Sequence, residues 1–310
     1  MEIENGLKKC GLDDLCFPVK LIENPNNCNT EHSKIVCGII GNDPYHLNYC
    51  SSRYELVPNQ EIFPVIEDIL NKNGIEFESH YTHTKYSRFY AKYVITDPRF
   101  AYIMNGTNDV IRFVWNFQHS YNGLTKYRGT AGFYRQICTN GLMVPIKAMN
   151  KYNLCIQGKH TSSILGSLQS FKNILLTLIE DINVIKNDIG KNYEILGGRW
   201  VANVEDRVKE VLNTMNIVKS FDDIDLSIMS AKDRGIYAKQ IEVNNEKVNS
   251  ILAVINNEAN NKNLGYNGKV NDWLIYNGIN NYIHDDNRNV VAPEKRMETD
   301  GKVLEYLLSV

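Results

Sequence analysis

The spacing of apolar residues changes once along the chain, near residue 162. Before that point, apolar residues alternate with polar ones or form short runs, which is typical of strands. Strands are predicted at 34–40, 52–57, 75–81, 86–95 and 110–120. Beyond residue 162, apolar residues recur every three or four positions, which predicts helices. The order of these segments indicates an α+β fold, with an N-terminal antiparallel sheet that carries one or two helices and a mostly helical C-terminal region.

The segment 86–95 divides its side chains between two faces, because successive residues of a strand point in opposite directions. We expect the apolar set in the core and the polar set at the surface, facing solvent or a ligand. The core set is Phe89, Ala91, Tyr93 and Ile95, and the open set is Arg88, Tyr90, Lys92 and Val94. The strand at 110–120 repeats the pattern, with Ile111, Phe113, Trp115 and Phe117 on one side and Arg112, Asn116 and Gln118 on the other.

Three regions follow from these patterns. Residues 1–30 contain prolines and several asparagines but few periodic apolar positions, so they are predicted to form an irregular arm. Residues 31–160 are predicted to form the sheet domain, with a helix after Asn59 that ends at Asn73-Gly74. Residues 161–310 are predicted to form the helical region.

Charge is distributed unevenly between these regions. The whole chain has a net charge of −2, but residues 79–179 hold twelve lysines and arginines against two acids, a net charge of +10. Of the sixteen aromatic residues in this range, twelve lie among these cations in strand-like runs, namely Tyr81, Tyr86, Phe89, Tyr90, Tyr93, Phe113, Trp115, Phe117, Tyr121, Tyr127, Phe133 and Tyr134. Basic grooves with aromatic platforms hold single-stranded nucleic acid. The alternative is that half of the aromatics form the core and the cations only solvate one face of a sheet.

We expect a groove for single-stranded nucleic acid on the open face of the sheet, where cations would contact phosphates and an aromatic ring would stack on a base. The residues predicted to line it are Arg88, Tyr90, Lys92, Arg112, Lys126, Arg128 and Arg135.

Other classes of protein receive less support. No apolar run reaches the roughly 18 residues of a membrane span, and the first residues lack a secretory signal, so we expect a cytoplasmic protein without a membrane partner. Seven cysteines at irregular spacing predict free thiols, and we expect no metal and no cofactor. Cys138 with His119 or His160 is a conceivable nucleophile pair, but a buried thiol is the more frequent role of such a cysteine. An enzyme is therefore not the favoured interpretation.

The segment RQICTNGL at 135–142 follows a glycine-rich stretch and precedes a helical half that contains Trp273, Asn277 and His284. Together with SSRYELVPN at 51–59, this arrangement resembles the phage- and plasmid-borne family known as domain of unknown function 932. The resemblance extends from about residue 50 to residue 308. It implies a role in DNA metabolism, recombination, counter-defence or the virion. The order of elements is also loosely similar to the Rad52-type single-strand annealing proteins, at the level of fold only.

These observations favour a nucleic-acid-binding protein of phage or plasmid origin. We expect it to bind single-stranded DNA without sequence readout, in recombination, annealing or replication, as a homo-oligomer in the host cytoplasm. The alternative is a structural or interaction protein of a phage, in the virion or in counter-defence, without nucleic-acid activity.

Overall fold

The computed structural model of the chain describes residues 3–4, 7–26, 32–135, 141–142, 155–158, 164–218, 229–285 and 293–310. These residues divide between two units, which are described separately. The sheet unit comprises Met1–Ala101, Arg112–Phe133 and Lys147–Lys186. The helical unit comprises Tyr102–Ile111, Tyr134–Ile146 and Asn187–Val310. Cys138, Asn140 and His160 lie outside the described residues.

A nine-stranded sheet runs in the order β1-β2-β6-β7-β9-β10-β11, with β12 paired to β10 and β8 paired to β9. The pairs β1–β2, β2–β6, β6–β7, β7–β9, β8–β9 and β10–β12 are antiparallel, and the strands predicted at 75–81 and 86–95 form the hairpin β6–β7. The strands are β1 Ile3–Glu4, β2 Leu7–Cys10, β6 Phe77–Thr84, β7 Arg88–Ile95, β8 Tyr102–Ile103, β9 Val110–Ser120, β10 Tyr127–Arg135, β11 Gly141–Leu142 and β12 Cys155–Gly158. A second sheet has the order β3-β4-β5 and consists of β3 Val19–Glu23, β4 Lys34–Ile40 and β5 Asp43–Cys50.

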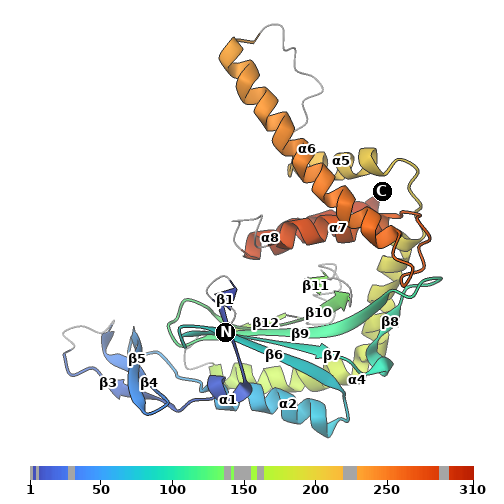
Figure 1. Cartoon of the computed structure of the whole chain (residues 1–310). Helices are drawn as coiled ribbons and strands as arrows, with labels where there is room; N and C mark the ends of the chain where they lie inside the picture. The colour runs from blue at the N-terminus through green and yellow to red at the C-terminus, as the bar shows by residue number, and fades with distance from the viewer. Residues whose placement is uncertain are drawn as a thin grey trace. The chain divides into compact units, whose positions relative to one another are not determined.

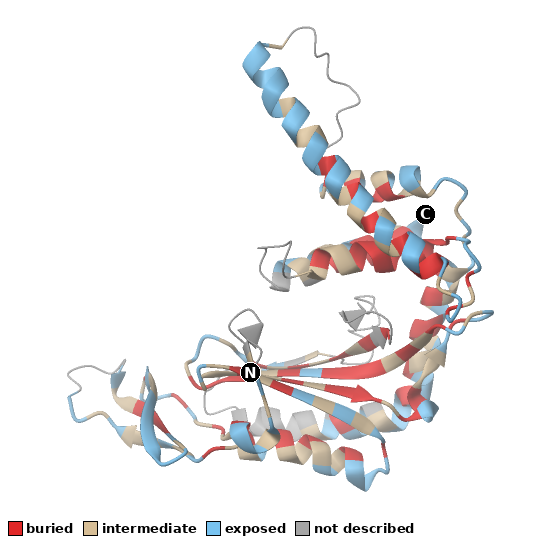
Figure 2. Ribbon diagram, viewed as in Figure 1, coloured by how far each residue is buried: buried red, intermediate tan, exposed pale blue. Residues whose placement is uncertain are grey.

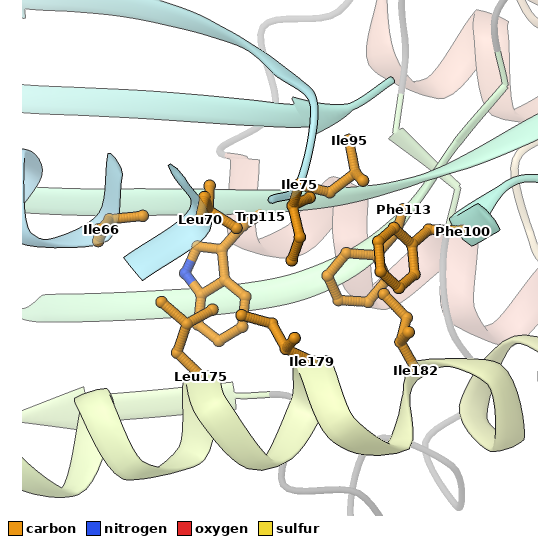
Figure 3. Close-up of a pocket in the computed structure, with 10 residues that line it drawn as sticks. All are labelled: Ile66, Leu70, Ile75, Ile95, Phe100, Phe113, Trp115, Leu175, Ile179 and Ile182. Carbon is orange, nitrogen blue, oxygen red and sulfur yellow. The ribbon is translucent and has the colours of Figure 1, made fainter. Parts of the chain in front are cut away.

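Two helices, α2 and α4, cover one face of the large sheet within the sheet unit (Figure 1). The helical elements of this part are α1 Leu12–Leu15, η2 Asn59–Glu61, α2 Phe63–Lys72, η3 Pro98–Phe100 and α4 Ile164–Gly197, of which α4 continues into the helical unit. Phe63 of α2 makes edge-on ring contacts with Tyr81 and Phe117 of the sheet, at 6.1 and 5.7 Å between centroids. Figure 3 shows Leu175 and Ile182 of α4 directed toward the same face. The cavity left between them is only about 20 Å³ and has an apolar lining, which excludes an ordered water because a water needs polar partners.

The helical unit is built around α7 Asp272–His284, in which every residue from Asp272 to Asn280 is buried. The other helices are α5 Val204–Thr214, α6 Ala231–Ala259 and α8 Pro293–Ser309. The C-terminal half of α6 buries Val248, Ile251 and Ile255 at helical spacing, whereas its N-terminal half is mainly exposed (Figure 2). Gly278 lets α6 and α7 approach closely, since a Cβ there would lie 2.5 Å from Ile255 Cγ1.

The structure confirms the α+β fold, but two predicted segments differ. Residues 52–57 are not a strand; the strand β5 ends at Cys50, before the apolar positions of that segment. The first thirty residues contribute β2 to the large sheet and β3 to the small one, so their described part is more regular than the predicted arm. These strands have only four or five residues, which is too short for alternation to be visible in the sequence. Among the described helices, none combines the length and the apolar composition that crossing a bilayer requires.

Candidate nucleic-acid interface

One row of polar side chains crosses four strands of the large sheet. Lys9 of β2 is opposite Thr82 of β6, Thr82 is opposite Tyr90 of β7, and Tyr90 is opposite Gln118 of β9. Directly opposed residues of antiparallel strands project on the same face. Neighbouring strands are about 4.8 Å apart, so this row extends over roughly 14 Å. A polar track of this length is suited to an extended ligand.

Two further rows lie on either side of the first one. Lys92 is flanked by His80 on β6 and Asn116 on β9, and Arg88 is flanked by Thr84 and Ser120. Glu78 adds an acid to this face, and its carboxylate lies 3.9 Å from His80 Nε2. The register of the strand pairs therefore places Arg88, Tyr90 and Lys92 on one face.

The reverse face of the same strands is the core. Phe89 and Tyr93 of β7 have no solvent exposure, and Trp115 and Phe117 of β9 are each 2% exposed. Between them, Arg88, Tyr90 and Lys92 are half-buried. The predicted core face of β7 and β9 is therefore confirmed, and Arg88, Tyr90 and Lys92 lie on the other face as predicted. Val94, predicted on the open face with them, is instead buried opposite the buried Val114 of β9.

Arg128 extends the polar face to β10. It is half-buried and opposes the exposed Gln157 of β12. Lys126 is exposed in the loop that leads into β10. Arg112 also lies on the polar side of β9, but its Nη1 donates to the backbone carbonyl of Thr96 at 2.6 Å, so part of its hydrogen-bonding capacity is used.

Two guanidinium groups on this face keep unused donors. Among the residues that the structure describes, neither Arg88 Nε nor Arg128 Nε has a hydrogen-bond partner, although both atoms are buried. A buried donor without a partner costs about 1 to 3 kcal/mol. An arginine that retains free N–H groups can use its planar fork for the two oxygens of a phosphate. Because these Nε atoms are buried, an anionic ligand would have to contact the Nη groups of the two half-buried side chains.

Arg135 does not belong to this face, which corrects the predicted groove. It lies in the helical unit, where its side chain is completely buried between two carboxylates. Its Nη2 is 2.6 Å from Asp109 Oδ2 and its Nη1 is 2.5 Å from Glu258 Oε2. Burial alone would lower the pKa of Arg135, but the hydrogen bond and charge of Asp109 outweigh it and raise the pKa above its ordinary value. Burial raises the pKa of Glu258 despite the neighbouring arginine.

Two aromatic side chains complete the environment of Asp109. Tyr266 Oη and Trp273 Nε1 both donate to Asp109 Oδ2, at 2.9 and 3.0 Å. With the guanidinium, these donors compensate a carboxylate that has lost its water. The arginine that precedes the CTNGL segment and the later tryptophan thus meet in one buried network, which indicates a structural role for both.

The other residues of the recognised pattern also lie inside the helical unit. Asn277 Nδ2 donates to the carbonyl of Trp273 at 2.7 Å. His284 Nε2 is 3.1 Å from the buried carboxylate of Asp300, which also accepts from Asn280 Nδ2 at 2.7 Å. Burial raises the pKa of Asp300, while His284 and Asn280 oppose that shift. These contacts join α7 to α8.

Sequence reasoning missed Lys9, which the sheet brings into the row of Tyr90. It lies in the segment predicted to be an irregular arm, and the sequence LKKC is too short to reveal its alternation. The candidate residues that the structure brings together are therefore Lys9, Arg88, Tyr90, Lys92 and Arg128, with Arg112 and Lys126 at the margins.

Comparison with known proteins gives one match. Residues 46–191 match the family model described as Domain of unknown function (DUF932). This range includes strands β6 to β10 and hence most of the polar face. No curated protein and no solved structure matches the chain. The match confirms the predicted family resemblance over residues 46–191. The predicted extension to residue 308, which includes Trp273, Asn277 and His284, lies outside the matched range. The family description names no activity, so the activity is inferred from the geometry.

Proposed function

We propose that the protein binds single-stranded nucleic acid on the polar face of the large sheet, most of which lies within residues 46–191, the part of the chain that matches the DUF932 model. The observation that carries the proposal is the set of rows around Tyr90, in which cations and hydrogen-bonding side chains surround one aromatic ring. Phosphates would contact Arg88, Lys92 and Arg128, and a base would stack on Tyr90.

The chemistry of the face favours contacts to the backbone of the ligand over reading of its sequence. Lysine and arginine side chains on the face of a sheet reach phosphates, whereas base-specific recognition needs donors and acceptors matched to base edges. A stacking ring accepts every base, because each base has a π face. We therefore propose non-specific binding of single-stranded DNA, of the kind used in recombination, annealing or replication.

Fluorescence anisotropy with a labelled single-stranded oligonucleotide tests the proposal. We expect micromolar or tighter binding at low salt and a decrease of the logarithm of the association constant with the logarithm of salt concentration. The three cations proposed to contact phosphates, Arg88, Lys92 and Arg128, would give a slope of about −2.1 for a single strand. Duplex DNA of the same sequence is the matched control and should bind more weakly, since its bases cannot stack on Tyr90. Lack of binding at low salt would exclude the proposal.

A role in protein interaction is the second candidate, and the small sheet favours it. Ile39, Tyr45 and Tyr49 are 45%, 46% and 51% exposed there. Aromatic and aliphatic side chains at a surface are typical of contacts between proteins. For a phage protein, such contacts would belong to the virion or to counter-defence. If the protein binds the oligonucleotide and loses that binding when Arg88 and Lys92 are replaced, protein interaction is not its main function.

We also propose that the protein, as a non-specific binder of single-stranded DNA, acts in the host cytoplasm and forms a homo-oligomer. Light scattering coupled to size exclusion tests the oligomeric state, with and without oligonucleotide. A monomer under both conditions would contradict this part of the proposal and leave the binding itself unaffected.

A further inference from the structure

The helical unit contains a cavity of about 230 Å³ whose lining comes from three parts of the chain. They are the β8–β9 loop around Asn105, the end of α4 with the adjoining Trp200, and the loop 265–271 that contains Lys269. All of these residues belong to the helical unit, so the cavity is separate from the polar sheet face.

Backbone contacts hold the walls of this cavity in place. The N–H of Asn108 donates to the carbonyl of Leu264 at 3.0 Å, which joins two of the loops. Gly265 has a φ of +84°, and a Cβ there would meet Thr107 Cα at 3.5 Å. Asn271 pairs with Trp200 through the backbone, and its Nδ2 donates to the carbonyl of Gly197 at 2.8 Å. The cavity is thus formed before any ligand binds.

Trp200 supplies the aromatic surface of the site. It is 56% exposed, whereas the other two tryptophans of the chain, Trp115 and Trp273, are buried. Lys269 Nζ lies 6.0 Å from the centre of the Trp200 ring. An exposed tryptophan leaves a large apolar ring in contact with water, which is unfavourable. A flat ligand that carries a negative charge would cover the ring and pair with the neighbouring lysine.

Glu194 supplies an acceptor in a fixed position. Its Oε1 accepts from the hydroxyl of Tyr102 at 2.9 Å and from the backbone N–H of Asn105 at 2.8 Å. Among the described residues, both donors reach the same oxygen, so Oε2 keeps its lone pairs for a ligand. A carboxylate oxygen accepts from the N–H groups at the edge of a base.

We propose that this cavity binds a single nucleotide, with its base on Trp200, an N–H edge of the base toward Glu194 and its phosphate toward Lys269. A cationic ligand fits less well, because Lys269 would repel it. An uncharged sugar would leave the lysine without a role. The nucleotide uses the ring, the carboxylate and the ammonium group together.

The buried network of Asp109 supports the floor of this site. Tyr266 lines the cavity, and its hydroxyl donates to Asp109 Oδ2. The backbone N–H of Asp109 donates to Thr107 Oγ1, which lies in the loop that forms another wall. The arginine that anchors Asp109 therefore also fixes the geometry of the cavity.

Equilibrium dialysis of the full chain with radiolabelled deoxyadenosine monophosphate tests the proposal. Tryptophan emission, compared between the parent and Trp200→Phe to isolate the contribution of Trp200, provides a second measurement. We expect saturable binding with a dissociation constant below about 1 mM and a matching change in emission. Deoxyribose 5-phosphate should bind at least tenfold more weakly, because it lacks the base. Equal binding of the sugar phosphate, or no saturable binding of the nucleotide, would overturn the proposal.

Variants separate the site from the rest of the surface. Trp200→Leu should weaken nucleotide binding roughly fivefold to a hundredfold, whereas Trp200→Phe should retain most of it. Lys269→Ala should weaken binding, and Lys262→Ala, which removes an exposed lysine outside the lining, should not. Nucleotide binding that survives Trp200→Leu, or that responds equally to both lysine variants, would show that the ligand lies elsewhere. Because the assay uses a mononucleotide, its outcome is distinct from that of oligonucleotide binding to the sheet face.

Discussion

Arg135 and Asp109 form an ion pair from which water is excluded: the two side chains have no solvent exposure, and Nη2 lies 2.6 Å from Oδ2. The pair joins β10 to the turn before β9, and Glu258 extends it to α6. Removing one partner of such a pair leaves an uncompensated buried charge, which is far more costly than losing an exposed salt bridge.

We therefore expect Arg135→Met to lower the free energy of unfolding by about 3 to 5 kcal/mol, because Asp109 and Glu258 would remain buried without their cation. Lys302→Ala is the matched control, since it removes an exposed pair with Glu298 on α8 and should cost no more than about 0.5 kcal/mol. Urea denaturation of both variants measures the difference. Similar small losses would mean that water reaches Asp109.

The polar face gives a second prediction. Substitutions at neighbouring positions of β7 should affect different properties, either nucleic-acid binding or stability. Arg88→Ala with Lys92→Ala should leave the melting temperature nearly unchanged and reduce the salt slope of oligonucleotide binding by about 1.4, or 0.7 for each lost phosphate contact. Tyr90→Ala should weaken binding by about 1 to 3 kcal/mol through lost stacking. Thermal melts and salt-dependent anisotropy measure both properties.

Phe89→Ala is the control for this face, because Phe89 is fully buried on the reverse side of the same strand. It should lower the free energy of unfolding by about 3 to 5 kcal/mol. If the Arg88 and Lys92 variant neither unfolds the protein nor changes its binding, the polar face has another role, and the protein-interaction candidate gains support.

Patterns within single segments of the sequence predicted which side of a strand faces the core, because strand geometry alone determines it. The alternation of β7 was sufficient to assign Phe89 to the core and Lys92 to the polar face, because every second residue of a strand points to the same side. Arg135 shows the limit of this reasoning. It is the last residue of β10, and strand alternation places it on the side of the buried Ala131 and Phe133. Its partners Asp109 and Glu258 are 26 and 123 residues away, so no local pattern shows that its charge is compensated inside the protein. Lys9 was missed for the same reason, since only the pairing of β2 with β6 brings it to the face.

The turn of the β6–β7 hairpin gives a third prediction. Lys85 and Tyr86 have φ values of +47° and +53°, and Ser87 N–H donates to the Thr84 carbonyl, which defines a two-residue turn of type I′. Asparagine tolerates this conformation, so Lys85→Asn should stabilise the protein by about 0.5 to 1 kcal/mol, and Lys85→Val should destabilise it by about 1 to 2 kcal/mol. Differential scanning calorimetry checks the signs. Lys72→Asn, in the helix α2, is the control and should be slightly destabilising; a gain there as well would point to a charge effect.

The same hairpin contains a histidine whose protonation should weaken the fold. His83 is 2% exposed and stacks on Tyr86 at 4.2 Å, and its Nδ1 accepts the backbone N–H of Tyr86. Burial lowers the pKa of His83 below its ordinary value of 6.5, and Lys8 lowers it further, while Asp14 opposes the shift. Protonation would place a second donor against the Tyr86 N–H, so the charged form is disfavoured in the folded state.

A lowered pKa means that the unfolded chain binds the proton first, so the stability that neutral His83 provides is complete above pH 6.5 and decreases as the pH falls below that value. We expect His83→Gln, which keeps an acceptor but cannot be protonated, to lose less stability than the parent between pH 7 and pH 5. Lys8→Ala should also reduce the loss, because it removes a cation that opposes protonation. Urea denaturation at several pH values gives the three slopes, and the exposed His46→Gln variant controls for the general effect of acid. Equal slopes for the parent and His83→Gln would show that His83 is protonated as readily in the folded protein as in the unfolded chain.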